Sequence, residues 1–183
     1  LEFGKKCLEA DRIIQIDGIL NGTTNYILSE MDQNGISFDQ ALQQAKELGY
    51  AEADPKLDIN GLDTAAKLVI MANFLLEKEI TLNDVEIEGI TNITSEDIIE
   101  AKNQNKIIKL IASISETETK KIYVKPMKLN RTDPMAVLGA LNSVKFVSEF
   151  AGEEIIIGKG AGGHETASAI LRDLLDIKNN MRV

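Results

Sequence analysis

The chain has 183 residues, of which 44% are hydrophobic, and this predicts one domain with a substantial core rather than a disordered chain. Its formal net charge of −9 argues against partners that need a basic face, such as nucleic acid or an anionic membrane. One His and one Cys, with no secretory signal and no apolar run long enough to span a bilayer, argue against a transition-metal site and predict a cytoplasmic protein.

The first half opens with a strand and continues with helices. Residues 12–20 are rich in Ile and predict a strand that ends at an Asn-Gly pair. A helix capped by a Thr is expected over residues 23–33. Another helix follows, because Ser37 and Gln40 have the spacing of a capping box and Gly49 stands where a helix commonly ends.

A polar loop and a long apolar helix come next. Pro55 excludes a continuous helix across residues 50–61, where Asp and Asn favour turns. From Leu62 to Leu76 the side chains are apolar nearly all round, so we expect this helix to be buried on most sides.

The second half mixes strands with helices. The predicted strands cover residues 85–90, 106–117 and 120–130, and residues 143–160 form a hairpin that turns at Ala151 and Gly152. The predicted helices cover residues 95–105, capped by Ser95, residues 133–141, with Pro134 at the start, and residues 162–177. This order predicts an α+β fold, with a mixed, mostly antiparallel sheet and helices on one face.

Asp63 and Lys67 are the first candidates for chemistry. Four residues apart on a helix, they share one face. They can form a plain surface ion pair, or they can face a cleft, where a Lys held by an Asp can donate a proton or stabilise an oxygen that gains charge.

The loop before this helix carries Tyr50, Glu52, Asp54 and Asp58. Such an acidic turn can be simply solvated, but at the mouth of a cleft its carboxylates could bind an amine or a divalent cation. The spacing of a calcium loop is absent.

Two glycine-containing stretches are candidates for ligand binding. Residues 21–25, Asn-Gly-Thr-Thr-Asn, form either a plain turn with a cap or a helix start whose amides hold a carboxylate. Residues 158–163 fit G-x-G-x-x-G between a strand and a helix, yet too little chain follows for a complete dinucleotide fold. A tight turn is the alternative there, and neither His164 nor Cys7 has a partner that indicates a role.

Three segments together resemble the homoserine dehydrogenase family. They are GILNGTTNYIL, LGYAEADPKLDINGLDTAAKL and GKGAGGHETASAILRDLLDI, and their order and spacing match the family from about Asp11 to Ile177. The resemblance implies NAD(P)-dependent, reversible interconversion of L-aspartate 4-semialdehyde and L-homoserine, a branch step toward threonine, isoleucine and methionine. It also implies a homodimer in which the sheets of two subunits pack.

The resemblance assigns roles to particular residues. Lys67 matches the Lys that donates or accepts the hydroxyl proton, and Asp63 would orient it and hold the substrate. Substrate binding would also involve Glu52, near the substrate amino group, Asp58, Tyr50 and the backbone of Gly22 and Thr23. The cofactor-facing segment would be Gly160, Ala161, Gly162 and Gly163.

The resemblance further implies two parts within the chain. Residues 1–160 would be the substrate-binding, catalytic and dimerisation domain, and residues 161–183 a helix that packs on a nucleotide-binding domain outside this sequence. That domain would hold most of the NAD(P), so we expect the chain alone to be inactive. The alternatives are a non-catalytic dimerisation or interaction module and a different dehydrogenase with the same substrate domain.

Overall fold

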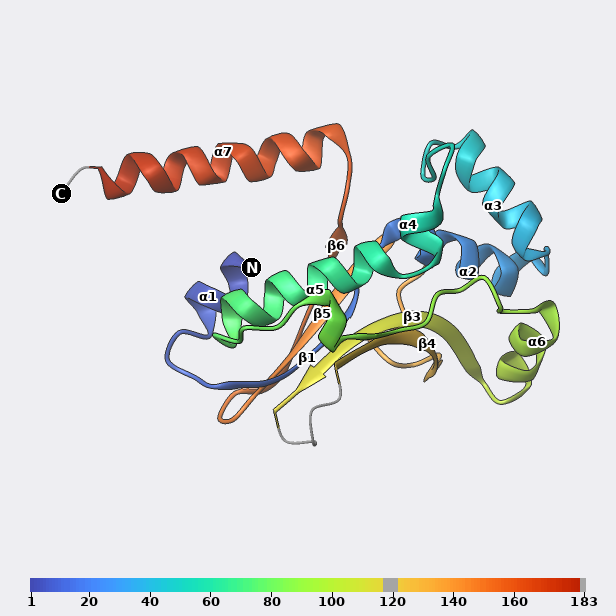
Figure 1. The fold of residues 1–183 in the computed structure, drawn as a ribbon, viewed down its shortest axis with the longest axis horizontal. Helices are drawn as coiled ribbons and strands as arrows, with labels where there is room; N and C mark the ends of the chain where they lie inside the picture. The colour runs from blue at the N-terminus through green and yellow to red at the C-terminus, as the bar shows by residue number, and fades with distance from the viewer. Residues whose placement is uncertain (117–121, 182–183) are drawn as a thin grey trace.

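A mixed six-stranded sheet forms the body of the computed structural model, which describes residues 1–116 and 122–181 (Figure 1). The strands are β1 (Ile13–Ile19), β2 (Glu86–Ile87), β3 (Lys106–Ser115), β4 (Ile122–Asn130), β5 (Leu141–Ser148) and β6 (Gly152–Lys159). The helices are α1 (Glu2–Cys7), α2 (Gly22–Asn34), α3 (Phe38–Glu47), α4 (Lys56–Ile59), α5 (Leu62–Leu75), a 3-10 turn (Leu82–Asp84), α6 (Ser95–Asn103) and α7 (Gly163–Asn180).

The strand order is β2-β4-β3-β1-β5-β6. The β2–β4 pair is parallel and the other four pairs are antiparallel, which confirms the α+β class and the mostly antiparallel sheet. The predicted β5–β6 hairpin is confirmed as well. The predicted polar turn between β3 and β4 lies outside the described residues.

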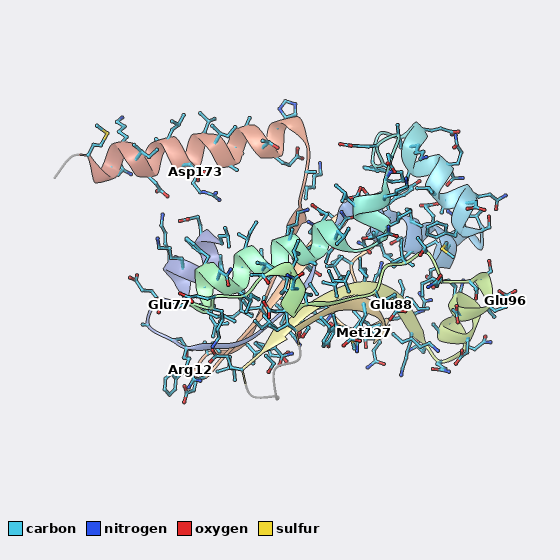
Figure 2. All side chains as sticks on the ribbon, in the orientation of Figure 1. Arg12, Glu77, Glu88, Glu96, Met127 and Asp173 are labelled. Carbon is cyan, nitrogen blue, oxygen red and sulfur yellow. The ribbon has the colours of Figure 1, made fainter. Side chains whose placement is uncertain are left out.

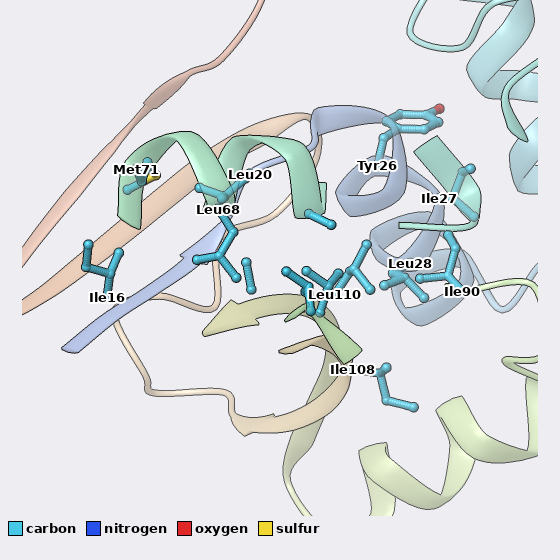
Figure 3. Close-up of a cluster of buried hydrophobic side chains, with 14 of the residues drawn as sticks. Ile16, Leu20, Tyr26, Ile27, Leu28, Leu68, Met71, Ile90, Ile108 and Leu110 are labelled. Atoms are coloured by element: carbon cyan, nitrogen blue, oxygen red, sulfur yellow. The ribbon is translucent and has the colours of Figure 1, made fainter. Parts of the chain in front are cut away.

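Helix α5 covers the sheet and closes the main core. Figure 3 shows Leu68 and Met71 of α5 above Ile16 of β1 and Leu110 of β3, and all four belong to one buried cluster. Because β1 lies in the middle of the sheet, its carboxyl end, where the chain passes into α2, is surrounded by other elements. This junction forms one wall of the candidate site.

Helix starts are capped largely as expected, with two corrections. Ser37 and Gln40 form the predicted capping box of α3. The cap of α2 is Asn21 rather than a Thr, because its side-chain oxygen accepts the backbone N–H of Thr24 at 2.9 Å. The cap of α6 is Thr94 rather than Ser95, because Thr94 forms the reciprocal capping box with Asp97.

The predicted helix over residues 133–141 is wrong. The segment between β4 and β5 is a run of turns, with an Asp133 side chain that accepts the backbone N–H of Met135 at 2.8 Å and a left-handed Gly139 at φ 63°. The carbonyl groups of Met135 and Val137 accept hydrogen bonds from side chains of other elements, and that of Asp133 accepts the backbone N–H of Ala136 at 2.8 Å, as in a turn. Val137 is buried against Ile19 and Ile111, so this segment, residues 131–140, packs on the sheet, and we call it the strap.

Two expectations about residues 50–76 also need correction. No continuous helix crosses residues 50–61, as predicted from Pro55, but the loop contains the one-turn helix α4, whose N-cap is Pro55. Helix α5 is not buried on most sides, since Leu62, Ile70 and Phe74 are 38%, 55% and 45% exposed. These three side chains follow one another at helical spacing, so α5 presents an apolar outer face.

Helix α7 lies apart from the body and runs beside α5 and α1 (Figure 1). Among the described residues, its ion pairs with the remainder of the chain are Lys6–Asp176 at 2.7 Å and Lys159–Glu165 at 3.2 Å. Its side chains stand free around the helix, as near Asp173 in Figure 2. Five apolar side chains on it are 55 to 60% exposed: Ile170, Leu171, Leu174, Leu175 and Ile177. None of the helices within the described ranges is long and apolar enough to cross a membrane.

Candidate active site

A pocket of about 630 Å³ lies where the carboxyl end of β1, the starts of α2 and α5, and the end of β6 meet. It brings together nine of the eleven predicted site residues, although they come from four separate stretches of chain. The nine are Gly22, Thr23, Tyr50, Asp58, Asp63, Lys67, Gly160, Ala161 and Gly162.

The Asp63–Lys67 pair forms one side of this pocket. Lys67 Nζ lies 2.7 Å from Asp63 Oδ2 and 3.0 Å from the carbonyl oxygen of Leu20. The ammonium has three N–H bonds, so two are used within the described part of the chain and the third can meet a ligand oxygen. The Lys67 side chain is 46% exposed, so it can reach such a ligand without first leaving a buried position.

Asn21 joins the two acids of the pocket and is a residue that the sequence did not single out as functional. Its amide nitrogen donates to Asp58 Oδ1 at 2.7 Å and to Asp63 Oδ2 at 2.8 Å. Its oxygen caps α2 at the same time, and the side chain is only 5% exposed. One buried amide therefore sets the position of both carboxylates relative to the start of α2.

The start of α2 lies in contact with the strap and with the acidic loop. A Cβ on Gly22 would lie 2.8 Å from the carbonyl oxygen of Ala140, so only glycine fits there without movement of the backbone. Thr23 Oγ1 donates to the carbonyl oxygen of Tyr50 at 2.6 Å, and the Tyr50 ring packs on Tyr26 with 4.9 Å between centroids. These contacts hold the first turn of α2, with its free amides, at the pocket wall.

The glycine segment after β6 closes the opposite wall. A Cβ on Gly160 would meet the side chain of Asn142, and Gly162 has φ 134°, a conformation that favours glycine. Lys159 pairs with Glu165 across this segment at 3.2 Å. The pKa of Glu165 is lowered by a hydrogen bond from its own backbone N–H and, second, by Lys159.

The two remaining predicted residues lie elsewhere. Glu52 is exposed and is not among the residues that line the pocket, although it belongs to the acidic loop beside it. Gly163 is the first residue of α7 and is exposed outside the lining. The described ranges contain no group of three or more His, Cys, Asp or Glu side chains placed to hold a metal ion.

The pocket therefore combines a partly free ammonium, two carboxylates fixed by one amide, the amides of a helix start and a glycine turn. Such a set can hold a small molecule that carries an amine and a carboxylate, and it can place an ammonium against an oxygen that gains negative charge. The glycine turn allows a planar group to approach the backbone closely.

The chain is similar in sequence and fold to known proteins over nearly its whole length. A profile of the homoserine dehydrogenase family matches residues 1–175. The chain is 45% identical over 182 residues to homoserine dehydrogenase of Methanocaldococcus jannaschii. The aligned region covers 100% of this chain and 53% of that relative. It therefore spans about half the length of the curated relatives it matches.

Solved structures match equally well. A homoserine dehydrogenase from Thiobacillus denitrificans superposes with a TM-score of 0.92 and 37% identity, over 96% of this chain and 41% of that one. A hyperthermophilic archaeal homoserine dehydrogenase mutant in complex with NADPH superposes with a TM-score of 0.82 and 31% identity, over 97% of this chain and 51% of that one.

Proposed function

The chain belongs to the homoserine dehydrogenase family, and from that premise we propose that it is the substrate-binding and catalytic half of an NAD(P)-dependent homoserine dehydrogenase. The reaction would be the reversible interconversion of L-aspartate 4-semialdehyde and L-homoserine in the cytoplasm, in the biosynthesis of threonine, isoleucine and methionine. The observation that carries the proposal is the Lys67–Asp63 pair, which faces the same pocket as the glycine turn 160–162.

Lys67 would handle the proton of the reaction. Hydride transfer to an aldehyde builds negative charge on its oxygen, and an ammonium beside that oxygen stabilises the charge and supplies the proton of the product hydroxyl. Asp63 and the Leu20 carbonyl hold Nζ from two sides, so the remaining N–H has a defined direction. NAD(P) would supply the hydride, with Gly160 to Gly163 against its nicotinamide end.

The acids and the start of α2 would hold the two ends of the amino-acid substrate. Asp58 and Asp63, fixed by Asn21, offer carboxylate oxygens to an ammonium. Glu52, in the adjoining loop, would approach the substrate amino group when the substrate is bound. The amides of Gly22 and Thr23 would receive the substrate carboxylate, and the Tyr50 ring would form part of the wall.

The exposed apolar surfaces support a division of the chain into two parts. We propose that residues 1–160 form the substrate and dimerisation domain and that residues 161–183 pack on a nucleotide-binding half outside this sequence. The support is the apolar stripe of α7 and the apolar outer face of α5, since an exposed apolar surface of this kind usually marks an interaction site. Most of the cofactor would be bound by that half, so the chain alone should be inactive.

A homodimer is part of the same proposal. The side of the sheet away from α5 carries Met127, seen in Figure 2, together with Leu129 and Leu141, which are only partly buried around Ile19 and Ile111. A second copy could cover this apolar side. Light scattering over a range of concentrations tests it, and a monomeric mass throughout would contradict it.

Complementation tests the catalytic proposal. The chain is mixed with a separately expressed nucleotide-binding half, or the full-length gene is used, and NAD(P)H absorbance is followed with L-homoserine. We expect activity from the combination, none from the chain alone, and a fall of about 100- to 10,000-fold for Lys67→Ala.

Lys56→Ala is the matched control, because Lys56 is an exposed lysine of α4 that pairs with Asp54 at 3.6 Å outside the pocket lining. It should leave the rate unchanged. Full activity of Lys67→Ala would make the Lys67–Asp63 pair structural. A full-length protein without activity on homoserine would favour the interaction-module alternative.

A further inference from the structure

Lys109, in the middle of β3, is the largest fully buried side chain of the described residues, with 0% of its surface exposed. A lysine is rarely buried without a partner, because its amine loses hydration that only hydrogen bonds can replace. The proposed chemistry makes no use of it, since Lys109 is not among the residues that line the pocket.

The partners of Lys109 lie one turn apart on α2. Nζ donates to Asn25 Oδ1 at 2.6 Å and to Ser29 Oγ at 3.0 Å. Two donated bonds are the number that a neutral amine can make, so the arrangement suits the neutral form as well as the ammonium. Burial lowers the pKa of Lys109 to about 7, Asp32 opposes that shift and Arg131 adds to it.

Asn25 and Ser29 in turn hold the strap between β4 and β5. Asn25 Nδ2 donates to the carbonyl oxygens of Val137 at 3.2 Å and Leu141 at 2.8 Å. Ser29 Oγ accepts the backbone N–H of Gly139 at 3.1 Å. Three backbone groups between Val137 and Leu141, at the end of the strap and the first residue of β5, are therefore tied to α2, and Lys109 binds both of the side chains that tie them.

The end of this strap and the start of β5 form a wall of the pocket. Ala140, Leu141 and Asn142 all line it, and Ala140 presses on Gly22 at the start of α2. The Asn142 side chain would meet a Cβ on Gly160, so this wall reaches across to the glycine turn, and its Oδ1 is buried without a hydrogen-bond partner among the described residues.

We propose that Lys109 is a positioning residue, which through Asn25 and Ser29 fixes residues 137–142 and thereby sets the pocket wall between Gly22 and Gly160. This proposal extends the function proposed above and rests on it for its kinetic test. A small displacement of such a wall can lower a rate about 100-fold, because catalysis depends on the placement of the reacting groups.

The test compares Lys109→Met with Ile108→Ala in the full-length protein. Ile108 is the neighbouring core residue of β3, 4% exposed, and it belongs to the main core cluster. Peptide-level hydrogen exchange and steady-state kinetics with L-homoserine are measured for both variants, well below the melting temperature of each. Ser29→Ala, which keeps Lys109 and removes the Gly139 bond, serves if Lys109→Met does not fold.

We expect Lys109→Met and Ser29→Ala to accelerate exchange selectively over residues 137–142 and to lower kcat/KM for homoserine by about 10-fold or more. Ile108→Ala should do neither. Exchange that rises evenly over the chain, with kinetics like those of Ile108→Ala, would overturn the proposal. A wild-type protein that does not oxidise homoserine would refute the proposed function, while the exchange result would still decide the role of Lys109.

Discussion

At the scale of single residues, the pocket depends on Asn21 as much as on the charged groups it holds. The Asp63–Lys67 pair could be predicted, because the helical period alone places both on one face. The role of Asn21 could not, because Asp58 and Asp63 come within reach of its amide only when α4 and α5 fold back onto the end of β1. The role of Lys109 could not be predicted either, since its burial depends on α2 and on the strap.

Asn21→Ala should therefore weaken both the fold and the site. Loss of the α2 cap costs about 1 kcal/mol of unfolding free energy. Asp58 and Asp63 also lose their shared donor, so kcat/KM for homoserine should fall about 10- to 100-fold. Urea unfolding and steady-state kinetics measure the two effects.

The matched control is Thr94→Ala, which removes the equivalent cap of α6 away from the pocket. It should cost a similar free energy and leave the kinetics intact. Equal kinetic losses in the two variants would show that Asn21 acts only as a cap.

Lys109 should also make stability depend on pH. Its pKa is about 7 in the folded chain against 10.5 as the ordinary value, so between these values the unfolded state binds more protons. Its contribution to unfolding free energy should be flat below pH 7 and rise above it, on the order of 1.4 kcal/mol per pH unit within that window.

The measurement is urea unfolding of the wild type and Lys109→Met from pH 6 to pH 10, where the difference between the two curves isolates Lys109. A difference that stays constant across this range would mean that Lys109 titrates near its ordinary value in the fold.

At the scale of elements, the errors of prediction come from long-range contacts. Residues 133–141 have a proline start and apolar spacing that suit a helix, yet their backbone groups bind Asn25, Ser29 and Ser143. Local helix propensity does not predict hydrogen bonds to side chains that α2 and β5 supply. The apolar composition of α5 predicts burial on most sides, yet its outer face is exposed, because composition does not tell which surface covers a helix.

The contact between α2 and the strap gives an element-scale test. Gly22→Ala places a Cβ 2.8 Å from the Ala140 carbonyl oxygen, a backbone atom that cannot turn away as a side chain can. The two elements must separate, so we expect kcat/KM to fall about 10-fold or more.

Gly158→Ala is the control, because a Cβ there meets nothing within 4 Å. Steady-state kinetics of both variants in the full-length protein provide the measurement. Unchanged kinetics for Gly22→Ala would show that the wall tolerates the displacement.

At the scale of the whole molecule, α7 stands beside the body with its apolar stripe uncovered. If that stripe packs on a nucleotide-binding half, Leu171→Glu with Leu174→Glu should weaken the association by about 100-fold or more, because each buried leucine contributes about 1.5 to 3 kcal/mol. Titration calorimetry with the separate half measures it.

Asp173→Lys, on the polar side of α7 and 3.1 Å from Arg172, serves as the control for a change of charge. It should have little effect on the association. Equal affinities for the double variant and the wild type would place the contact elsewhere.

The position of β1 also bears on how the chain folds during synthesis. The strand ends at Ile19, whereas its neighbours in the sheet begin only at Lys106 and Leu141, so both are made well after it. A ribosome adds about 5 to 20 residues each second, so the central strand waits for several seconds with its apolar side chains and backbone groups unpaired. The helices α2, α3 and α5, which need only local contacts to begin, are made in that interval. Sheet formation should therefore be a late step, and a chaperone that shields β1 would act during this delay.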